Sequence, residues 1–240
     1  MAVPWKASVF RETGFTMNGI ERARADLAKH GWTVLRGQRF GAGHDEVLRI
    51  AAAFGRPSTR DGGQAVWEVR PRPGRDHGTF SERTGPAAFH TDAQYHAQPE
   101  DYVCLFVVRP ADDGGDTRVL GAAAALSSLP AGTLTALREP AWTWKVPEVF
   151  RSGAPAPTPT TVTTTAGTIR WRSDNLAGPP GRARRRPAAA FTAALDRAEA
   201  HQVRHRPGDV IILDNLRTLH ARTAFQDPAR LVLRVRLWAR

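Results

Sequence analysis

The segment Phe89-His90-Thr91-Asp92 places a histidine and a carboxylate two residues apart, and a further histidine, His220, lies near the C-terminus. In an extended segment alternate side chains share a face, so His90 and Asp92 face one point while Thr91 faces away. Two histidines and one carboxylate are the ligands of a facial iron(II) site, which leaves coordination positions open. Because an H-x-D pair alone often arises by chance, its meaning depends on the segments around it.

Around this segment the hydrophobic pattern predicts short strands separated by turns, together with a few helices. Pro187 suits the first turn of a helix, and Gly31 suits a C-cap. The expected strands are residues 32–36, 65–69, 102–108, 209–213 and 231–237, with a hairpin joining 161–163 to 168–171. The expected helices are residues 21–30, 44–54, 126–137 and 187–205. This content predicts a mainly β fold with peripheral helices, a jelly-roll-like double sheet.

Length and composition restrict the class of protein. The 240 residues suit one domain spanning 1–240. No run approaches the roughly 20 apolar residues that cross a bilayer, so no membrane partner is expected. Residues 1–6 lack the apolar stretch of a signal sequence. A single cysteine, Cys104, excludes an internal disulfide framework, and we expect a cytoplasmic location. The sequence predicts no particular oligomeric state.

The net charge of +11 comes almost entirely from arginine. A basic chain can bind nucleic acid, an anionic surface or small anions. Here the arginines are spread along the chain, and one tight cluster, from Arg182 to Arg186, lies in a stretch that we interpret as a Gly/Pro-rich loop. Such a charge cluster is usually a solvated surface. A nucleic-acid partner is therefore not expected.

Residues 58–88, just before the H-x-D pair, are rich in Gly, Pro, Arg and Asp apart from the short strand at 65–69. Long irregular segments in a compact domain are commonly functional. We therefore predict that residues 58–88 form a lid over the metal site.

Four separated segments together resemble the taurine dioxygenase and clavaminate synthase-like family of Fe(II)/2-oxoglutarate-dependent oxygenases. His30-Gly31-Trp32-Thr33-Val34-Leu35-Arg36-Gly37 is similar to the family's N-terminal helix-to-strand element. His90-Thr91-Asp92 matches its H-T-D/E metal motif, and Gly114-Gly115-Asp116-Thr117 matches its G-G-D-T turn. Residues 214–222, which begin Asp214-Asn215 and include His220 and Arg222, match its D-N-x-x-x-x-H-x-R segment. The resemblance covers most of the chain and implies a double-stranded β-helix core.

The resemblance also implies the site and its cofactors. His90, Asp92 and His220 are expected to bind Fe(II), and 2-oxoglutarate and O2 are the expected cosubstrates. Arg230 corresponds to the arginine that pairs with the C5 carboxylate of 2-oxoglutarate, a group that guanidinium grips bidentately. Thr117 is expected to add a hydroxyl hydrogen bond to that carboxylate. Arg234 lies four residues on, on the same strand face, and either supports that carboxylate or holds an acidic substrate.

Hydroxylation is the usual outcome in this family, with desaturation, cyclisation or epoxidation as alternatives, and Asp92 argues against the halogenating relatives. By the family resemblance we expect a small amino-acid-like or carboxylate-bearing substrate from secondary metabolism. It should reach the iron between residues 58–88 and 158–178. The candidate substrate-binding residues are Arg170, Arg172 and Gln94.

Other polar and aromatic residues are expected to have structural roles. Arg222 is expected to brace the metal loop through an ion pair, and Asn215 to fix a strand-to-loop turn. Packing roles are expected for Trp67, Trp171 and Phe80, and surface or loop positions for His77, His96, His201 and His205.

Two alternatives from other classes remain open at the level of sequence. One is an oxygenase that acts on nucleic acid or on a carrier-bound substrate, guided by the basic cluster. The other is a non-catalytic jelly-roll binding protein that retains the ligands as a remnant. The simultaneous presence of His90, Asp92, His220, Thr117 and Arg230 argues against the second, because drift would be expected to remove at least one of them.

Overall fold

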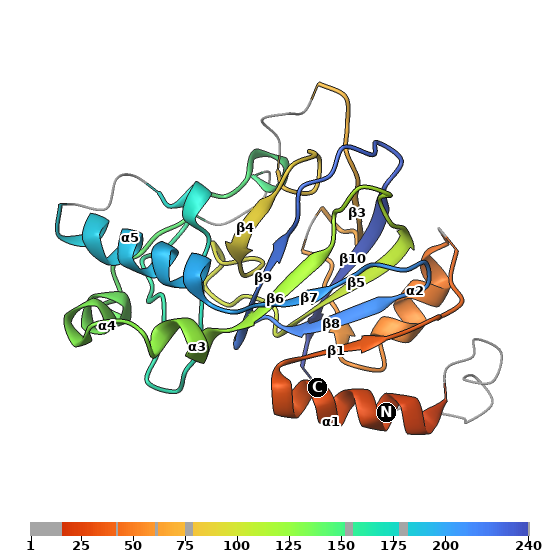
Figure 1. The fold of residues 1–240 in the computed structure, drawn as a ribbon, viewed down its shortest axis with the longest axis horizontal. Helices are drawn as coiled ribbons and strands as arrows, with labels where there is room; N and C mark the ends of the chain where they lie inside the picture. The colour runs from red at the N-terminus through yellow and green to blue at the C-terminus, as the bar shows by residue number, and fades with distance from the viewer. Residues whose placement is uncertain are drawn as a thin grey trace.

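Two antiparallel sheets stacked face to face form the centre of the computed structural model (Figure 1). The model describes residues 16–41, 43–60, 62–74, 79–151, 156–177 and 182–239, with the backbone alone at 182–184. The larger sheet has the strand order β1-β8-β5-β10-β2, and β3 pairs with another part of β10. The smaller sheet has the order β4-β9-β6-β7. The strands are β1 (Trp32–Leu35), β2 (Arg56–Pro57), β3 (Val66–Val69), β4 (Ala87–His90), β5 (Tyr102–Arg109), β6 (Thr117–Gly121), β7 (His201–Val203), β8 (Val210–Asp214), β9 (Thr218–Arg222) and β10 (Leu231–Trp238).

Helices cover the outer faces of both sheets (Figure 1). The two N-terminal helices pack on the larger sheet, whereas the other three gather beside the smaller sheet with the segment around Trp142, Trp144 and Trp171. The helices are α1 (Met17–His30), α2 (His44–Ala51), α3 (Ala122–Leu126), α4 (Ala131–Arg138) and α5 (Arg182–Arg197). The predicted class, mainly β with peripheral helices, is therefore confirmed. No helix in the described part of the chain has the length and apolar character needed to span a membrane.

Alternation along β5 explains how the larger sheet is buried on both sides. Val103, Leu105 and Val107 point into the apolar cluster between the sheets, whereas Cys104 and Phe106 point toward α1 and α2. This is the two-residue period of a strand, with both faces apolar because both are covered. Burial raises the pKa of the Cys104 thiol, so this cysteine is a packed, unreactive side chain.

Helix α1 shows why the sequence signals at its C-terminus were reliable. Gly31 takes a left-handed backbone conformation (φ +78°), and its N–H donates to the Leu27 carbonyl at 2.9 Å. A Cβ at this position would lie 2.6 Å from the Thr218 side chain, so glycine is required for packing as well. At the other end, Thr16 caps the helix by accepting from the Gly19 N–H, which places the start four residues before the predicted one.

Two predicted helices have different limits in the structure. The helix predicted at 126–137 is two helices, α3 and α4, because Pro130 interrupts the chain and sits at the N-cap of α4. The helix predicted at 187–205 begins at Arg182 and ends at Arg197, with Pro187 inside it. Arg and Ala are strong helix formers, so one more turn precedes the proline. The basic cluster therefore lies in a helix and not in a loop.

Other sequence predictions were incomplete. The predicted 161–171 hairpin contains only an isolated bridge between Thr163 and Ile169. Residues 201–203, predicted as helix, form strand β7 because they pair with β6. Strands β2, β6 and β9 were not predicted, since each is short or interrupted by the polar residues of a motif. The 58–88 segment contains β3, which pairs with β10 and so belongs to the sheet.

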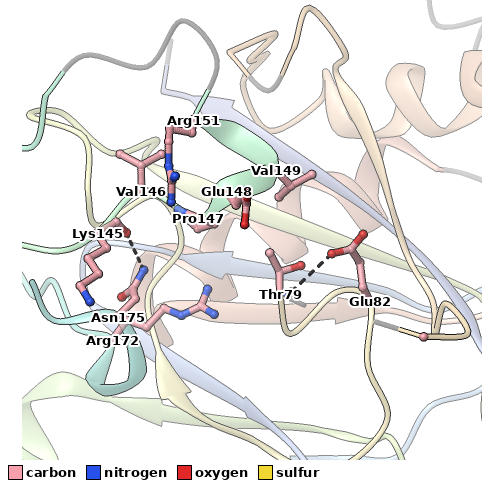
Figure 2. Close-up of a pocket in the computed structure, with 11 residues that line it drawn as sticks. Thr79, Glu82, Lys145, Val146, Pro147, Glu148, Val149, Arg151, Arg172 and Asn175 are labelled. Carbon is pink, nitrogen blue, oxygen red and sulfur yellow. Dashed lines mark hydrogen bonds between the residues drawn. The ribbon is translucent and has the colours of Figure 1, made fainter. Parts of the chain in front are cut away.

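A cavity of about 590 Å³ opens between the 58–88 segment and two other loops (Figure 2). Gly74, Thr79 and Glu82 line it from the first segment, and Arg172 and Asn175 from the second. The third loop, residues 145–151, contributes both acidic and basic side chains. Substrate access was expected between residues 58–88 and 158–178, whereas the contribution of loop 145–151 was not predicted.

The carboxylate of Glu100 joins distant parts of this fold. It is fully buried, accepts hydrogen bonds from Ser58 Oγ (2.7 Å) and Arg60 Nε (3.0 Å), and lies 3.5 Å from Arg236 Nη1. Burial favours the neutral acid, but Arg236 and Arg60 outweigh it and lower the pKa of Glu100. The stability that the charged group supplies is therefore present above the ordinary carboxyl pKa and is lost as the pH falls through the lowered one.

The variant Glu100→Gln is expected to lower the free energy of unfolding at pH 7 by about 3 kcal/mol, because it removes the negative charge that Glu100 places beside the buried guanidinium of Arg236. Urea unfolding followed by fluorescence measures this. The matched control is Glu68→Gln, which removes a partly exposed pair with Arg70 and should cost less than about 1 kcal/mol. Equal, small decreases in the free energy of unfolding for both variants would contradict the role of Glu100.

Candidate metal and cosubstrate site

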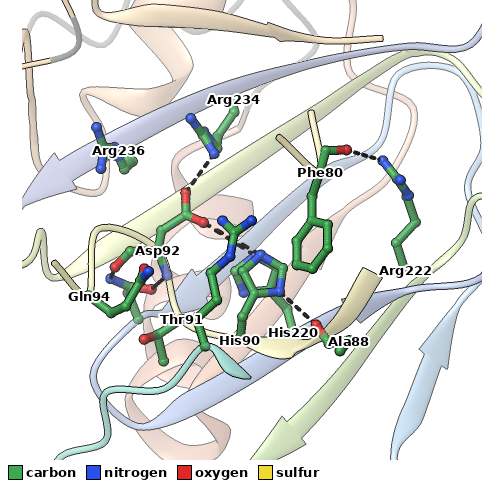
Figure 3. Close-up of polar contacts among 12 residues, drawn as sticks. Phe80, Ala88, His90, Thr91, Asp92, Gln94, His220, Arg222, Arg234 and Arg236 are labelled. Carbon is green, nitrogen blue, oxygen red and sulfur yellow. Dashed lines mark hydrogen bonds and ion pairs between the residues drawn. The ribbon is translucent and has the colours of Figure 1, made fainter. Parts of the chain in front are cut away.

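The three predicted metal ligands come together on the smaller sheet (Figure 3). His90 is the last residue of β4 and is paired with His220 in β9, with ring centroids 4.2 Å apart. Asp92 Oδ1 lies 3.8 Å from His90 Nε2 and 3.7 Å from His220 Nε2. All three residues are buried, and the ligand atoms lie within 4.8 Å of one another. Two imidazoles and a carboxylate at this spacing fit one Fe(II) ion.

Strand β4 ends at His90, so Asp92 lies in the following turn and not in the extended segment that was predicted. Thr91 nevertheless faces away from the ligands, because its hydroxyl accepts from the Trp171 N–H at 3.1 Å. The turn continues through Ala93, which has a positive φ of 56°. Such a conformation is unusual for a residue other than glycine and persists where surrounding bonds fix it.

Asn215 supplies those bonds. Its Oδ1 accepts from the Asp92 N–H at 2.7 Å, and its Nδ2 donates to the carbonyls of Asp92 (3.0 Å) and Glu100 (2.9 Å). The side chain is 1% exposed, and its bonds hold the turn that contains Asp92 against the corner between β8 and β9. Asn215 was predicted to fix a strand-to-loop turn, and the turn that it fixes is the one that contains Asp92.

The histidines are in the protonation state that a metal requires. His90 Nδ1 lies 2.8 Å from the Ala88 carbonyl, to which it donates, so its Nε2 carries the lone pair toward Asp92 and His220. Burial lowers the pKa of His90 well below its ordinary value, with His220 and Arg172 adding to the effect. Burial likewise lowers the pKa of His220. Both imidazoles are therefore neutral at neutral pH.

Asp92 is ionised because cations surround it. Burial alone opposes its charge, but the guanidinium of Arg234, with Nη1 at 3.0 Å from Asp92 Oδ2, and that of Arg236 outweigh it. The pKa of Asp92 is consequently held below its ordinary value. An anionic carboxylate beside two neutral imidazoles completes the donor set that suits Fe(II).

Arg230 and Thr117 line the same inner cavity as the three ligands. The Arg230 side chain is 3% exposed; its Nη2 donates to the Gly115 carbonyl at 3.1 Å, and its guanidinium lies over the Phe225 ring. Its Nε and Nη1 are buried and have no hydrogen-bond partner among the described residues. Burial lowers the pKa of Arg230 to about 10, so it remains cationic at neutral pH. A buried cation with two unused donors fits a carboxylate ligand.

The glycine before Asp116 makes room for this arginine. Gly115 has a φ of +71°, and a Cβ there would lie 2.7 Å from Arg230 Nε. Any other residue would both strain the backbone and displace the guanidinium. The G-G-D-T turn therefore shapes the pocket through its second glycine as well as through Thr117.

His205 was expected at the surface or in a loop; it lies in the loop after β7, but its side chain is buried and not at the surface. The side chain is 9% exposed, and its Nε2 lies 2.8 Å from Thr117 Oγ1. The alternation of buried Val203 and His205 with exposed Arg204 and Arg206 was the available signal. It was missed because residues 201–205 were assigned to a helix. Of the other histidines in that group, His77 lies outside the described residues.

Arg222 binds backbone carbonyls and not the carboxylate of the predicted ion pair. Its guanidinium donates to the carbonyls of Phe80 (2.6 Å), Arg83 (2.9 Å) and Gly85 (3.0 Å). It therefore braces the end of the 58–88 segment against β9, at the edge of the inner cavity. Packing roles were expected for Trp67, Trp171 and Phe80. Trp171 is fully buried in the core, whereas Phe80 lines the inner cavity.

The three candidate substrate residues have different surroundings. Arg172 lines both the inner cavity and the 590 Å³ cavity of Figure 2, which we call the outer cavity. It pairs with Asp174 at 2.8 Å and lies over the Phe80 ring. Arg170 instead donates to the carbonyls of His96 and Ala97. Gln94 donates to Asn175 at 2.9 Å and is buried. Gly178, the last residue of the predicted access segment, lies outside the described residues.

Comparison with known proteins defines the class. The model of the taurine catabolism dioxygenase TauD, TfdA family matches residues 15–236. The chain therefore belongs to the TauD/TfdA family of Fe(II)- and 2-oxoglutarate-dependent dioxygenases, as the sequence motifs predicted. No curated protein sequence matches the chain significantly.

Solved structures share the fold. An asparagine oxygenase in complex with Fe(II), 2S,3S-3-hydroxyasparagine and succinate has a TM-score of 0.77 and 21% identity, covering 98% of this chain and 80% of that one. The non-haem iron oxygenase OrfP, in complex with Fe, succinate and (3S)-hydroxy-L-Arg, has a TM-score of 0.75 and 19% identity, covering 98% of this chain and 86% of that one. At these identities the likeness establishes the jelly-roll fold.

The Asn215 bonds generate a prediction about metal affinity. Asn215→Ala is expected to weaken Fe(II) binding by about 10- to 100-fold, because the carboxylate of Asp92 is no longer held in place. Anaerobic titration with Fe(II), or with Co(II) as a spectroscopic probe, measures the change. Asn175→Ala, which removes an amide outside the ligand set, serves as the control and should bind metal like the unaltered protein. Wild-type affinity in Asn215→Ala would refute the prediction.

Proposed function

We propose that this dioxygenase hydroxylates a small amino-acid-like or carboxylate-bearing metabolite of secondary metabolism. The observation that supports the cosubstrate assignment most directly is Arg230, a buried cation with two unused donors in the cavity of the His-Asp-His group. Such a side chain is costly to bury without an anionic partner. A dicarboxylate that reaches from the metal to Arg230 supplies that partner.

The residues then have separate tasks. His90, Asp92 and His220 hold Fe(II), and Arg230 with Thr117 fixes the C5 carboxylate of 2-oxoglutarate. The chemistry supplied by the bound metal and cosubstrate is the reduction of O2, in which 2-oxoglutarate becomes succinate and CO2 and one oxygen atom enters the substrate C–H bond. The protein orients that C–H bond and excludes water from the inner cavity.

Arg230 is the better candidate of the two arginines for the cosubstrate. Arg234 already faces a carboxylate, that of Asp92, at 3.0 Å. We assign Arg234 to orienting Asp92 and, at the open side of the metal, to contacting an acidic group of the substrate. Arg230 instead donates to the Gly115 carbonyl and keeps Nε and Nη1 without a partner among the described residues.

The outer cavity supports a zwitterionic substrate. Basic Lys145, Arg151 and Arg172 and acidic Glu82 and Glu148 line the same space, so it can receive an ammonium and a carboxylate together. Arg172 also reaches the inner cavity and connects this space to the metal ligands. The fold relatives were solved in complex with hydroxylated asparagine and arginine, which are zwitterionic amino acids.

The competing proposal of a nucleic-acid substrate has less support. Arg185 and Arg186 are exposed on α5, and neither lines the inner or the outer cavity. We propose a small-molecule enzyme of the cytoplasm, consistent with the buried, unreactive Cys104.

The anaerobic protein with Fe(II) and 2-oxoglutarate is expected to develop a visible metal-to-ligand charge-transfer band. Arg230→Gln should raise the dissociation constant for 2-oxoglutarate by roughly 30- to 150-fold, because a hydrogen-bonded charge pair contributes about 2–3 kcal/mol. Arg70→Gln, at an exposed ion pair, is the control. Absence of the band in the unaltered protein would contradict the proposed function. A larger loss of 2-oxoglutarate affinity in Arg234→Gln than in Arg230→Gln would reverse the assignment of the two arginines.

Substrate identity is tested by succinate formation with a panel of free amino acids and carboxylate-bearing pathway intermediates. Arg172→Gln is expected to raise KM for the substrate so found by about 10-fold, the equivalent of one charge-assisted hydrogen bond, and to leave KM for 2-oxoglutarate unchanged. Lys29→Gln, which removes a cation at an exposed position of α1, is the control. Turnover of single-stranded nucleic acid in preference to every small molecule would contradict the proposal.

A further inference from the structure

His205 is held rigidly beside the cosubstrate end of the inner cavity. It follows β7, whose Val203 is paired with Thr117 of β6. Its backbone N–H donates to Asp116 Oδ1 at 2.9 Å, and the other carboxylate oxygen of Asp116 accepts from Gln202. The imidazole therefore has a fixed position relative to Thr117.

The imidazole is neutral and makes one side-chain hydrogen bond. Burial, helped by the nearby Arg230 cation, lowers the pKa of His205 to about 3. Nε2 lies 2.8 Å from Thr117 Oγ1, whereas Nδ1 is buried and has no hydrogen-bond partner in the described part of the chain. A neutral imidazole has one N–H and one lone pair, so the two tautomers leave different groups unsatisfied at Nδ1.

The cost of the unsatisfied group decides between the tautomers. If Nδ1 carried the proton, an N–H donor would be buried without an acceptor, which is rare in folded proteins. If Nε2 carries it, only a lone pair is left unused. The favoured tautomer therefore donates from Nε2–H to Thr117 Oγ1, and the Thr117 hydroxyl keeps its own proton for a different acceptor.

That acceptor has a defined place. Thr117 and Arg230 line the same cavity, and Arg230 has unused donors there. A hydroxyl that accepts from His205 keeps its proton for donation toward the cavity that Thr117 lines, which suits an anion and not a cation or a second donor. If Thr117 instead donated to His205, its oxygen would present lone pairs to the anion and repel it.

We propose that His205 is a positioning residue for the cosubstrate: by donating to Thr117 it turns the Thr117 hydroxyl into a donor aimed at the C5 carboxylate of 2-oxoglutarate. This rests on the proposed function, in which Arg230 and Thr117 bind that carboxylate. His205 itself does not touch the reacting atoms.

The binding test uses two oxo acids on the anaerobic Fe(II) protein. 2-Oxoglutarate has the distal carboxylate, whereas pyruvate chelates metal in the same way but lacks it. His205→Leu is expected to weaken 2-oxoglutarate binding on the order of 10-fold, the low end of what loss of an outer-shell partner costs, and to leave pyruvate binding unchanged. His205→Gln, whose amide N–H replaces Nε2–H, should restore 2-oxoglutarate binding to within about threefold of the unaltered protein.

Two controls separate positioning from a general structural effect. His201→Leu is the same change at an exposed histidine of β7 and should alter neither oxo acid's binding. In a Thr117→Val background, His205→Leu should cause no additional loss of 2-oxoglutarate affinity, because the hydroxyl that His205 orients is absent. Equal weakening of pyruvate and 2-oxoglutarate, or additive losses in the double variant, would overturn the proposal.

A readout that requires no turnover is the tautomer itself. Nitrogen-15 NMR of the Zn(II)-loaded, histidine-labelled protein should show His205 as the Nε2–H form, with the resonance assigned by its absence in His205→Gln. An Nδ1–H or a protonated His205 would overturn the proposal while leaving the proposed function intact. Failure of the unaltered protein to bind 2-oxoglutarate would overturn the proposed function, and this proposal with it.

Discussion

The hydrogen bonds between the Asn215 side chain and the backbone of Asp92 are the constraint on which the site depends. Asn215 follows β8 of the larger sheet and precedes β9 of the smaller one, so it sits where the chain crosses between the sheets. From there it holds the turn after β4 and, through the Glu100 carbonyl, the start of β5. One side chain thus fixes the turn that contains Asp92 relative to β9, which contains His220. The arrangement of the three candidate ligands therefore depends on this corner as well as on the ligand residues.

The stacked sheets explain why a polar site can exist inside an apolar sandwich. Valine, leucine and isoleucine side chains fill much of the space between the sheets, and the site occupies a part of the smaller sheet where β4, β6 and β9 present polar side chains instead. Desolvation there favours neutral imidazoles at His90, His220 and His205, while clustered arginines keep Asp92 anionic. The same burial therefore prepares both the metal ligands and the anion pocket.

Sequence patterns predicted the chemistry of the site better than its supporting structure. His90, Asp92, Thr117, His220 and Arg230 stood in short motifs whose spacing implied a shared role, and the described residues bring all five to one cavity. The contributions of Gly115, Asn215 and His205 depend on contacts between segments about 90 or more residues apart, which no local pattern reports. Helix limits were missed for a related reason: Pro130 separates α3 from α4 and caps the start of α4, whereas Pro187 is accommodated within α5, and residues 201–203 become a strand only because β6 lies beside them.

The buried Arg230 has a kinetic consequence. On the proposed function, the carboxylate that it grips is the end of the cosubstrate that the reaction does not alter, so succinate leaves the metal with its distal anchor still bound. The product and the cosubstrate compete for the same guanidinium, and release of succinate requires a buried ion pair to separate. Succinate would then act as a competitive inhibitor with respect to 2-oxoglutarate, so turnover would slow as the product accumulates relative to its cosubstrate.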